Sequence, residues 1–201
     1  MPDPSGLGAA LQIAGASVSG YLLGSLPTAR WAARGSGVDP LVAGEGNPGA
    51  ANVWRLLGPR AGLTVLAADI GKGALAALAG LWLGGWWAGC SGLVLAMAGH
   101  AWPPWSRFRG GRSVACLIGG GLVLAPLPFL IALGVFLLLL RLVGLWRAAA
   151  AGLLAYPPLI FFLVSDHWRL IGIGVAYLVL LAAWRLGQRR HALPAGRTGP
   201  T

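Results

Sequence analysis

Residues 114–140 read VACLIGGGLVLAPLPFLIALGVFLLLL, an apolar run that is long for one membrane helix and is interrupted by Pro126 and Pro128. Proline cannot continue a helical hydrogen-bond ladder, so these residues either kink a single span or turn a hairpin between two spans. Cytoplasmic loops are enriched in Arg and Lys. A hairpin places nearly all loop arginines on one side, whereas a kinked span divides them about evenly. We therefore predict a hairpin with short arms near residues 114–125 and 127–140.

The composition of the whole chain is that of a membrane protein. Hydrophobic residues make up 57% of it, charged residues make up 10%, and the mean hydropathy is +0.74. Further apolar stretches, several of them near the length of a membrane-spanning helix, occur at residues 9–29, 61–83, 86–98, 148–164 and 170–184. We predict an all-α integral membrane protein, a compact bundle of about seven transmembrane helices with the N-terminus outside and the C-terminus inside. Six spans is the alternative count.

The predicted organisation is a single membrane domain over residues 1–201. Residues 1–8 form a short extracytoplasmic N-terminus, residues 9–184 form the helical bundle, and residues 185–201 form a basic cytoplasmic tail. The first apolar stretch follows Asp3 rather than a basic segment and is long, so we interpret it as a retained helix and not as a cleaved signal.

The charge and the cysteine and histidine content argue against several other classes of function. A net charge of +10 can indicate a nucleic-acid partner, but these arginines lie in short loops where topology and anionic lipid already explain them. Cys90 and Cys116 fall inside expected helices, and His100, His167 and His191 show no metal-ligand spacing. We expect no nucleic acid, no disulfide framework, no metal and no cofactor.

Two glycine-rich loops on the predicted inner face are the candidate functional segments. The first is residues 44–52 (GEGNPGAAN), ahead of a helix expected to begin near residue 61, and the second is residues 108–112 (FRGGR), ahead of the helix expected near residue 114. Unencumbered backbone N–H groups in such loops bind anions, and a following helix N-terminus favours negative charge. The alternative is that the glycines only turn the chain and the arginines only set topology. One such loop alone does not decide between these interpretations.

Together with other motifs, the two loops resemble one family. The residues that carry the resemblance are Gly24-Ser25-Leu26-Pro27, residues 39–52, Leu56-Leu57-Gly58, residues 69–73 and residues 99–115. From about residue 20 to residue 147 the chain resembles an acyl-phosphate:glycerol-3-phosphate acyltransferase of the bacterial PlsY family. The resemblance implies a seven-helix bundle in the bacterial inner (plasma) membrane, with its site facing the cytoplasm.

The implied reaction transfers a fatty acyl group from acyl phosphate to the 1-hydroxyl of glycerol 3-phosphate, giving 1-acylglycerol 3-phosphate (lysophosphatidic acid) and phosphate in phospholipid synthesis. The implied partners are these two substrates and membrane lipid. No Ser-His-Asp or Cys-His set is visible, so direct transfer is favoured, with a substrate phosphate oxygen or His100 accepting the proton. A catalytically silent phosphate- or lipid-binding member, acting as a scaffold or regulator, and a small membrane transporter are the alternatives. Acyl-chain preference, the exact acceptor and oligomeric state stay open.

The resemblance also implies the site residues. The candidate catalytic residues are Ser25, Asn47 and His100, and the candidate substrate-binding residues are Gly44, Gly46, Gly49, Asn52, Lys72, Gly110, Gly111, Arg112 and Arg141. Three of these have an alternative interpretation. Ser25 either faces the site or bonds its own helix, Lys72 either lines the site or only pairs with Asp69, and Arg141 either reaches a phosphate or anchors a helix end.

This chain departs from the family pattern at several positions. Leu41 stands where an arginine usually follows Asp39 by two residues, Glu45 where a small hydroxyl is usual, and Ala51 where a threonine is usual. Glu45 repels phosphate unless an arginine pairs with it. Gly110-Gly111-Arg112-Ser113 replaces a usual Gly-Gly-Lys-Gly. The third motif, with His, Glu and Asn before Arg-Leu, is not recognisable in residues 185–191.

Overall fold

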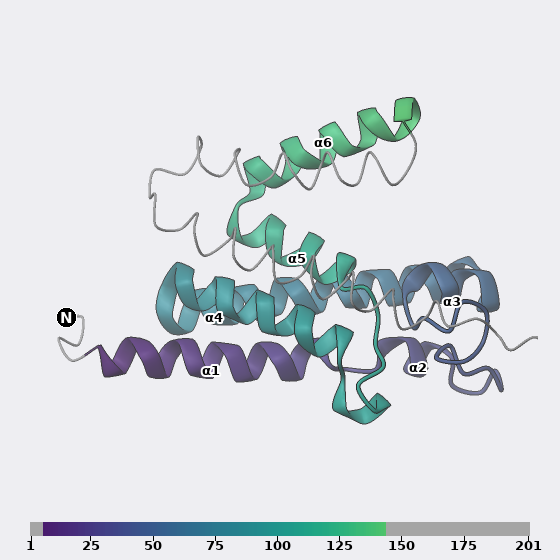
Figure 1. The fold of residues 1–201 in the computed structure, drawn as a ribbon, viewed down its shortest axis with the longest axis horizontal. Coiled ribbons are helices and arrows are strands. Elements are labelled where there is room, and N and C mark those ends of the chain that lie inside the picture. Colours follow the sequence, from purple (N-terminus) through teal and green to yellow (C-terminus); the bar gives the residue numbers. More distant parts are fainter. Residues whose placement is uncertain (1–5, 144–201) are drawn as a thin grey trace, which may run out of the picture.

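The computed structural model describes residues 6–143, and every regular element in this range is a helix (Figure 1). The elements are α1 (Leu7–Gly24), α2 (Thr28–Ala32), α3 (Ala50–Leu57), α4 (Pro59–Ala101), the 3-10 helix η1 (Pro104–Ser106), α5 (Val114–Leu124) and α6 (Pro126–Val143). The apolar stretches predicted at residues 148–164 and 170–184, and the basic tail, lie outside the described residues.

α4 consists of two helical arms joined at a sharp turn. The backbone leaves helical geometry at Gly84 and Gly85, and the latter has φ of +74°, a conformation that favours glycine. Residues 59–83 and 86–101 therefore form separate arms, which match the apolar stretches predicted at 61–83 and 86–98.

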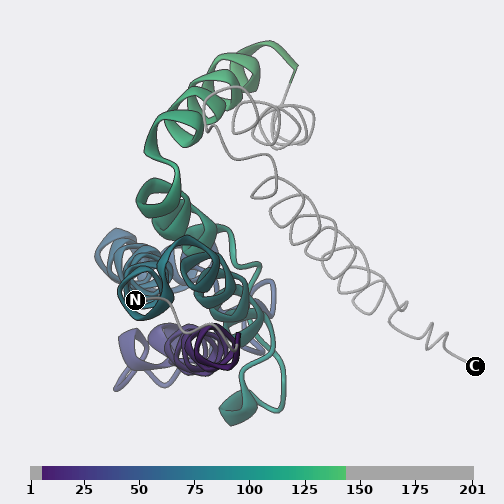
Figure 2. The ribbon, with the colours of Figure 1, turned by 90° about the vertical axis from the view of Figure 1, so that its left-hand side faces the viewer.

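The two arms pack side by side in opposite directions, and α1 packs against the second of them (Figure 2). A Cβ atom on Gly92 would lie 2.6 Å from the Ala76 carbonyl oxygen of the first arm, and one on Gly24 of α1 would overlap the Ala96 backbone. Backbones that approach this closely are typical of helix packing through small residues in membranes.

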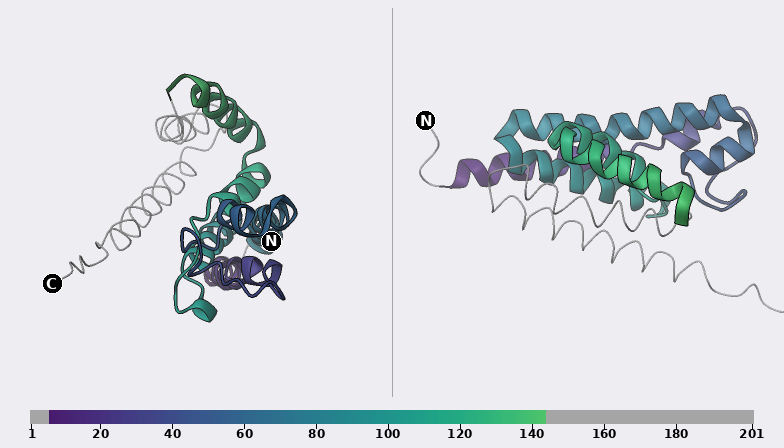
Figure 3. Two further views of the ribbon diagram at one scale, coloured as in Figure 1. Left: turned by 90° about the vertical axis from the view of Figure 1, so that its right-hand side faces the viewer. Right: turned by 90° about the horizontal axis from the view of Figure 1, so that it is seen from above.

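α5 covers the other side of the α4 arms. Its Cys116 forms a buried apolar cluster with Ala77, Leu93 and Met97, which brings both arms and α5 into one core. The long axes of α1 and α4 share a common direction in Figure 3. Many large apolar side chains of this bundle are exposed, with Trp82 the extreme at 86%. Such a surface suits contact with lipid.

The predicted interruption of the 114–140 run is present. α5 ends at Leu124, Pro126 begins α6, and α6 leads back in the direction from which α5 came (Figure 1). By length and composition, the helical stretches over residues 7–32 and 59–106 are suited to crossing a membrane, whereas residues 114–124 and 126–138 form shorter apolar helices.

Two short helices correct the expected boundaries. The stretch predicted as one span over residues 9–29 ends at Gly24, and α2 begins separately after Pro27. The first glycine-rich loop does not run on to the helix near residue 61, because α3 intervenes. Gly58, with φ of +87°, separates α3 from α4.

Candidate functional site

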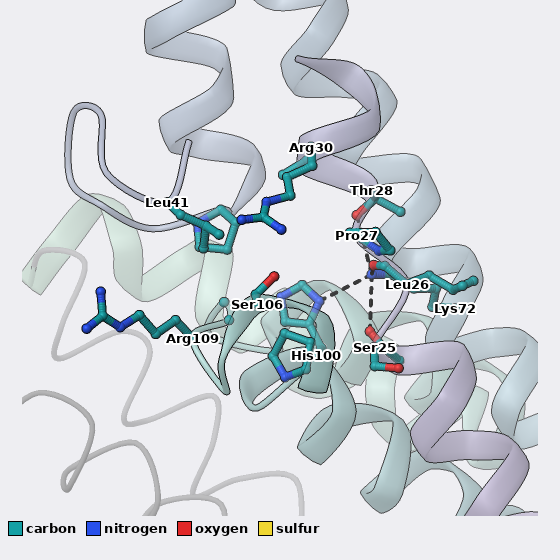
Figure 4. A pocket seen from close by; sticks show the side chains of 16 residues that line it. Ser25, Leu26, Pro27, Thr28, Arg30, Leu41, Lys72, His100, Ser106 and Arg109 are labelled. Carbon is teal, nitrogen blue, oxygen red and sulfur yellow. Dashed lines mark hydrogen bonds between the residues drawn. The ribbon is translucent and has the colours of Figure 1, made fainter. Parts of the chain in front are cut away.

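A pocket with several charged and hydroxyl side chains in its lining lies where the chain breaks between α1 and α2 (Figure 4). Segments that are distant in the sequence line it. They are residues 24–30 at the α1–α2 break, Leu41 and Pro48 between α2 and α3, Lys72 and His100 on the two α4 arms, and Pro103, Ser106, Arg109, Gly110 and Gly111 between α4 and α5. The pocket therefore draws together both loops that the sequence singled out.

A buried ion pair forms one wall of this pocket. Lys72 Nζ lies 2.8 Å from Asp69 Oδ1, and the two side chains are 5% and 2% exposed. Lys72 also donates to the Leu26 carbonyl at 2.9 Å and, at 3.3 Å each, to the Gly24 carbonyl and the Thr28 hydroxyl. A lysine ammonium has only three N–H donors, so these acceptors already occupy them. Both interpretations of Lys72 hold in part, since it lines the pocket while its ammonium is bound to protein groups.

His100 ends the second arm of α4 and faces this ion pair. Its Nδ1 lies 3.5 Å from Lys72 Nζ and 3.7 Å from Asp69 Oδ1. The Lys72 donors are taken by its other acceptors, so these two distances place the Nδ1 edge of the ring against the ion pair without assigning the ring hydrogen. The Nε2 side packs on Gly111, where an added Cβ would overlap that nitrogen. The Nε2 edge of His100 thus faces the second loop.

The second loop is held tightly against the end of α4. The Gly111 N–H donates to the His100 carbonyl at 3.0 Å, and an added Cβ on Gly110 would overlap that same carbonyl. Ser113 adopts a left-handed conformation with φ of +59°, and its hydroxyl donates to the Met97 carbonyl at 2.6 Å. The glycines permit this close approach, and Ser113 replaces the usual glycine while adding a buried hydrogen bond.

Asn52, a predicted substrate donor, has its side chain hydrogen-bonded to protein groups in this structure. Its side chain is 2% exposed, its Nδ2 donates to the carbonyls of Ala43 and Pro40 at 3.0 and 3.3 Å, and its Oδ1 accepts from the Glu45 N–H at 3.0 Å. A Cβ on Gly44, where φ is +62°, would overlap Asn52 Oδ1. Asn52 therefore organises the first loop from within, and its amide is occupied.

The remaining predicted residues fall into two groups. Ser25 lines the pocket but donates its hydroxyl to the Leu22 carbonyl at 2.9 Å, the helix-bonded alternative. Outside the pocket lining are Gly44, Gly46, Asn47, Gly49, Asn52 and Arg112. The Asn47 side chain accepts from the Gly49 N–H at 3.2 Å, a local turn contact. The Arg141 backbone belongs to α6, and its side chain lies outside the described residues.

Glu45 has the arginine partners that its position requires. Its carboxylate lies 2.7 Å from Arg55 Nη2 and 3.9 Å from Arg112 Nη2. The acidic residue that departs from the family pattern thus bridges α3 and the second loop, and two guanidinium groups offset its charge.

Sequence reasoning missed Thr28, Arg30 and Ser106 as pocket-lining residues. Arg30 is one of the loop arginines that topology alone explains, and Thr28 follows directly on the Ser25-Leu26-Pro27 motif, which is the available signal. Within residues 6–143, no three metal-ligating side chains come together.

Fold and site define a class: a helical membrane protein whose pocket, with cations and glycines in its lining, suits an anionic group. The family model described as Glycerol-3-phosphate acyltransferase matches residues 14–194. The chain belongs to this family.

Individual proteins of known name agree with this assignment. The glycerol-3-phosphate acyltransferase of Symbiobacterium thermophilum is 34% identical over 193 residues, which cover 94% of this chain and 96% of that protein. Glycerol-3-phosphate acyltransferase 1 of Deinococcus radiodurans is 37% identical over 182 residues, covering 88% and 89%. The crystal structure of PlsY (YgiH), an integral membrane glycerol 3-phosphate acyltransferase, in its glycerol 3-phosphate form, has a TM-score of 0.75 and 26% identity, covering 89% of this chain and 90% of that one.

The comparisons confirm the resemblance inferred from the motifs and the membrane nature inferred from composition. The family match extends beyond the described residues to residue 194, although the third motif is not recognisable there by eye.

Proposed function

We propose that this protein transfers a fatty acyl group from acyl phosphate to the 1-hydroxyl of glycerol 3-phosphate, forming 1-acylglycerol 3-phosphate and inorganic phosphate. The observation that carries the proposal is the pocket at the α1–α2 break, lined by cations and by Gly110 and Gly111, in a chain of the glycerol-3-phosphate acyltransferase family. The relatives carry acyltransferase names, which favours this activity over a silent scaffold or a transporter.

In the proposed reaction the acceptor hydroxyl oxygen attacks the carbonyl carbon of the acyl phosphate. A new ester C–O bond forms, the C–O bond to phosphate breaks, and phosphate leaves with the bonding electrons. The Nδ1 edge of His100 faces the Lys72–Asp69 pair. In the proposed step His100 donates from Nε2 to a substrate oxygen, and the hydroxyl proton passes to a phosphate oxygen.

The remaining site assignments follow from this chemistry. Gly110 and Gly111 bring the second loop against the bound phosphate, and Arg112, beside the pocket, supplies a guanidinium to it. Ser25 and Lys72 shape the wall of the pocket, and the first loop with Gly44, Gly46, Asn47 and Gly49 closes its rim. Two phosphate-bearing substrates held together gain most from positioning and charge neutralisation.

The proposed topology places this pocket at the cytoplasmic face of a bacterial inner membrane, in a single domain of seven spans with the N-terminus outside. The support is the charge distribution, because Arg30 and Arg109 line the pocket and Arg55, Arg107 and Arg112 lie on neighbouring segments. Cytoplasmic loops are where such arginines gather.

The test is phosphate release by the purified, detergent-solubilised protein given palmitoyl phosphate, with and without glycerol 3-phosphate. We expect release that requires the acceptor, 1-acylglycerol 3-phosphate as the product by mass spectrometry, and a strong reduction in His100→Ala and Arg112→Ala. If folded protein binds glycerol 3-phosphate but releases no phosphate from palmitoyl phosphate, the proposal is wrong. The protein is then a catalytically silent binding protein.

A further inference from the structure

We propose that Arg30 binds a substrate phosphate in the pocket, so that α2 supplies the guanidinium that position 41 lacks in this chain. The proposal rests on the proposed function. It concerns the phosphate group that acyl phosphate and glycerol 3-phosphate share, and the experiment below distinguishes the two.

The other cations of the pocket are poorly placed for this role. Among the described residues that line it, the permanently charged side chains are Arg30, Lys72 and Arg109. Lys72 is almost fully buried, and its donors are taken by Asp69 and by groups of the α1–α2 break. The Arg109 side chain points away from the other labelled side chains in Figure 4.

Arg30 reaches the pocket from α2 and keeps donors available. Its Nη1 donates to the Trp105 carbonyl at 3.3 Å, and its Nη2 lies 3.8 Å from Asp39 Oδ2, with the two side chains 42% and 45% exposed. A guanidinium has five N–H donors, so these two contacts orient the group and leave the other donors for an anion.

Leu41, the neighbour of Arg30 in the pocket, explains why the Arg30 guanidinium is needed there. Leu41 also lines the pocket and stands where the family pattern usually carries an arginine, and its side chain offers no charge. Figure 4 shows the Arg30 side chain extending from α2 toward Leu41. One guanidinium therefore still serves this side of the pocket, although it comes from a different element.

The test compares Arg30→Ala with the matched control Arg34→Ala, which removes an exposed arginine outside the pocket lining. The KM for each substrate is measured in detergent, and thermal unfolding is followed with and without inorganic phosphate. We expect Arg30→Ala to raise the KM of one substrate about 10- to 100-fold, which identifies the phosphate concerned, and to abolish the stabilisation by phosphate. Arg34→Ala should change neither quantity. Arg30→Lys should be intermediate, because an ammonium cannot make the planar two-point contact.

A double variant that moves the guanidinium from position 30 to position 41 tests whether Arg30 takes the place of an arginine at position 41. Adding Leu41→Arg to Arg30→Ala should recover at least part of the lost KM and phosphate stabilisation. Unchanged KM values and unchanged phosphate stabilisation in Arg30→Ala would overturn the proposal. So would a lower melting temperature with both KM values intact, because Arg30 would then only join Asp39 to Trp105. If the wild type released no phosphate, the proposed function would fail, and phosphate stabilisation would still decide the role of Arg30.

Discussion

Lys72 Nζ and Asp69 Oδ1 lie 2.8 Å apart, one helical turn from each other on the first arm of α4, and both side chains are almost fully buried. The same carboxylate oxygen accepts the Thr28 hydroxyl at 2.6 Å, while Lys72 donates to two carbonyls of the α1–α2 break. The pair therefore connects the middle of a long helix to the segment that opens the pocket. Charged groups in membrane helices are rare and commonly pair with one another or with backbone carbonyls, as these do.

Replacing Lys72 by Met should destabilise the protein by about 3–5 kcal/mol, because Asp69 is left as an uncompensated buried charge. Unfolding in mixed detergent micelles measures this loss. The double variant Lys72→Met with Asp69→Leu is the control, since it buries no charge and should be more stable than Lys72→Met alone. Equal stabilities of the two variants would contradict the prediction.

Replacing His100 by glutamine or by alanine distinguishes two roles of its side chain, as a hydrogen-bond donor or as a proton acceptor. A glutamine can still donate a hydrogen bond with its side-chain nitrogen, whereas it cannot act as a base near neutral pH. We expect His100→Gln to keep kcat within about tenfold of the wild type and His100→Ala to fall well below it. Loss of general-base catalysis costs about 10²- to 10⁴-fold, so a drop of that size in His100→Gln would identify His100 as the base.

Gly111→Ala should disable the site, because the added Cβ overlaps His100 Nε2 and must displace either the ring or the second loop. A misplacement of about 1 Å costs on the order of 100-fold in rate, and we expect a loss of that size in kcat/KM. Gly71→Ala is the matched control, since an added Cβ there meets nothing within 4 Å in α4. It should keep full activity and gain about 0.5–1 kcal/mol of stability. Similar activities of the two variants would show that this packing is irrelevant to catalysis.

Glu45→Ser should lower the KM for the phosphate substrates by up to about fivefold, because it removes a negative charge and releases Arg55 and Arg112. Stability should change by about 1 kcal/mol or less, since the pairs are exposed. The gain should shrink in high salt, where exposed charges are screened. Initial rates over a range of ionic strengths measure both effects, and a raised KM would mean that Glu45 positions Arg112 for the substrate.

Much of the fold was predictable from the sequence. The apolar stretches at residues 61–83 and 86–98 became the two arms of α4, and Pro126 separates α5 from α6 as predicted. These features depend on hydropathy and on the missing N–H of proline, which are local properties. α2 and α3 were missed because they span 5 and 8 residues, too few for a hydropathy signal.

The candidate site was predictable only in part. Ser25, Lys72, His100, Gly110 and Gly111 do come together around the pocket. Asn52 looked like a substrate donor because an exposed and a buried asparagine are identical in the sequence. Its three hydrogen bonds, to Pro40, Ala43 and Glu45, depend on how the segment between α2 and α3 folds back over α3.

The sequence by itself determined that this chain is a helical membrane protein with two anion-suited loops and the motifs of its family, because composition, glycine and proline act locally. Only the tertiary structure decided which polar groups stay available to a substrate. Lys72 and Asn52 are committed to protein acceptors, whereas Arg30 reaches the pocket beside Leu41 with donors to spare. The physical reason is that a donor's availability depends on the acceptors that packing brings within hydrogen-bond distance, and these come from segments far apart in the chain.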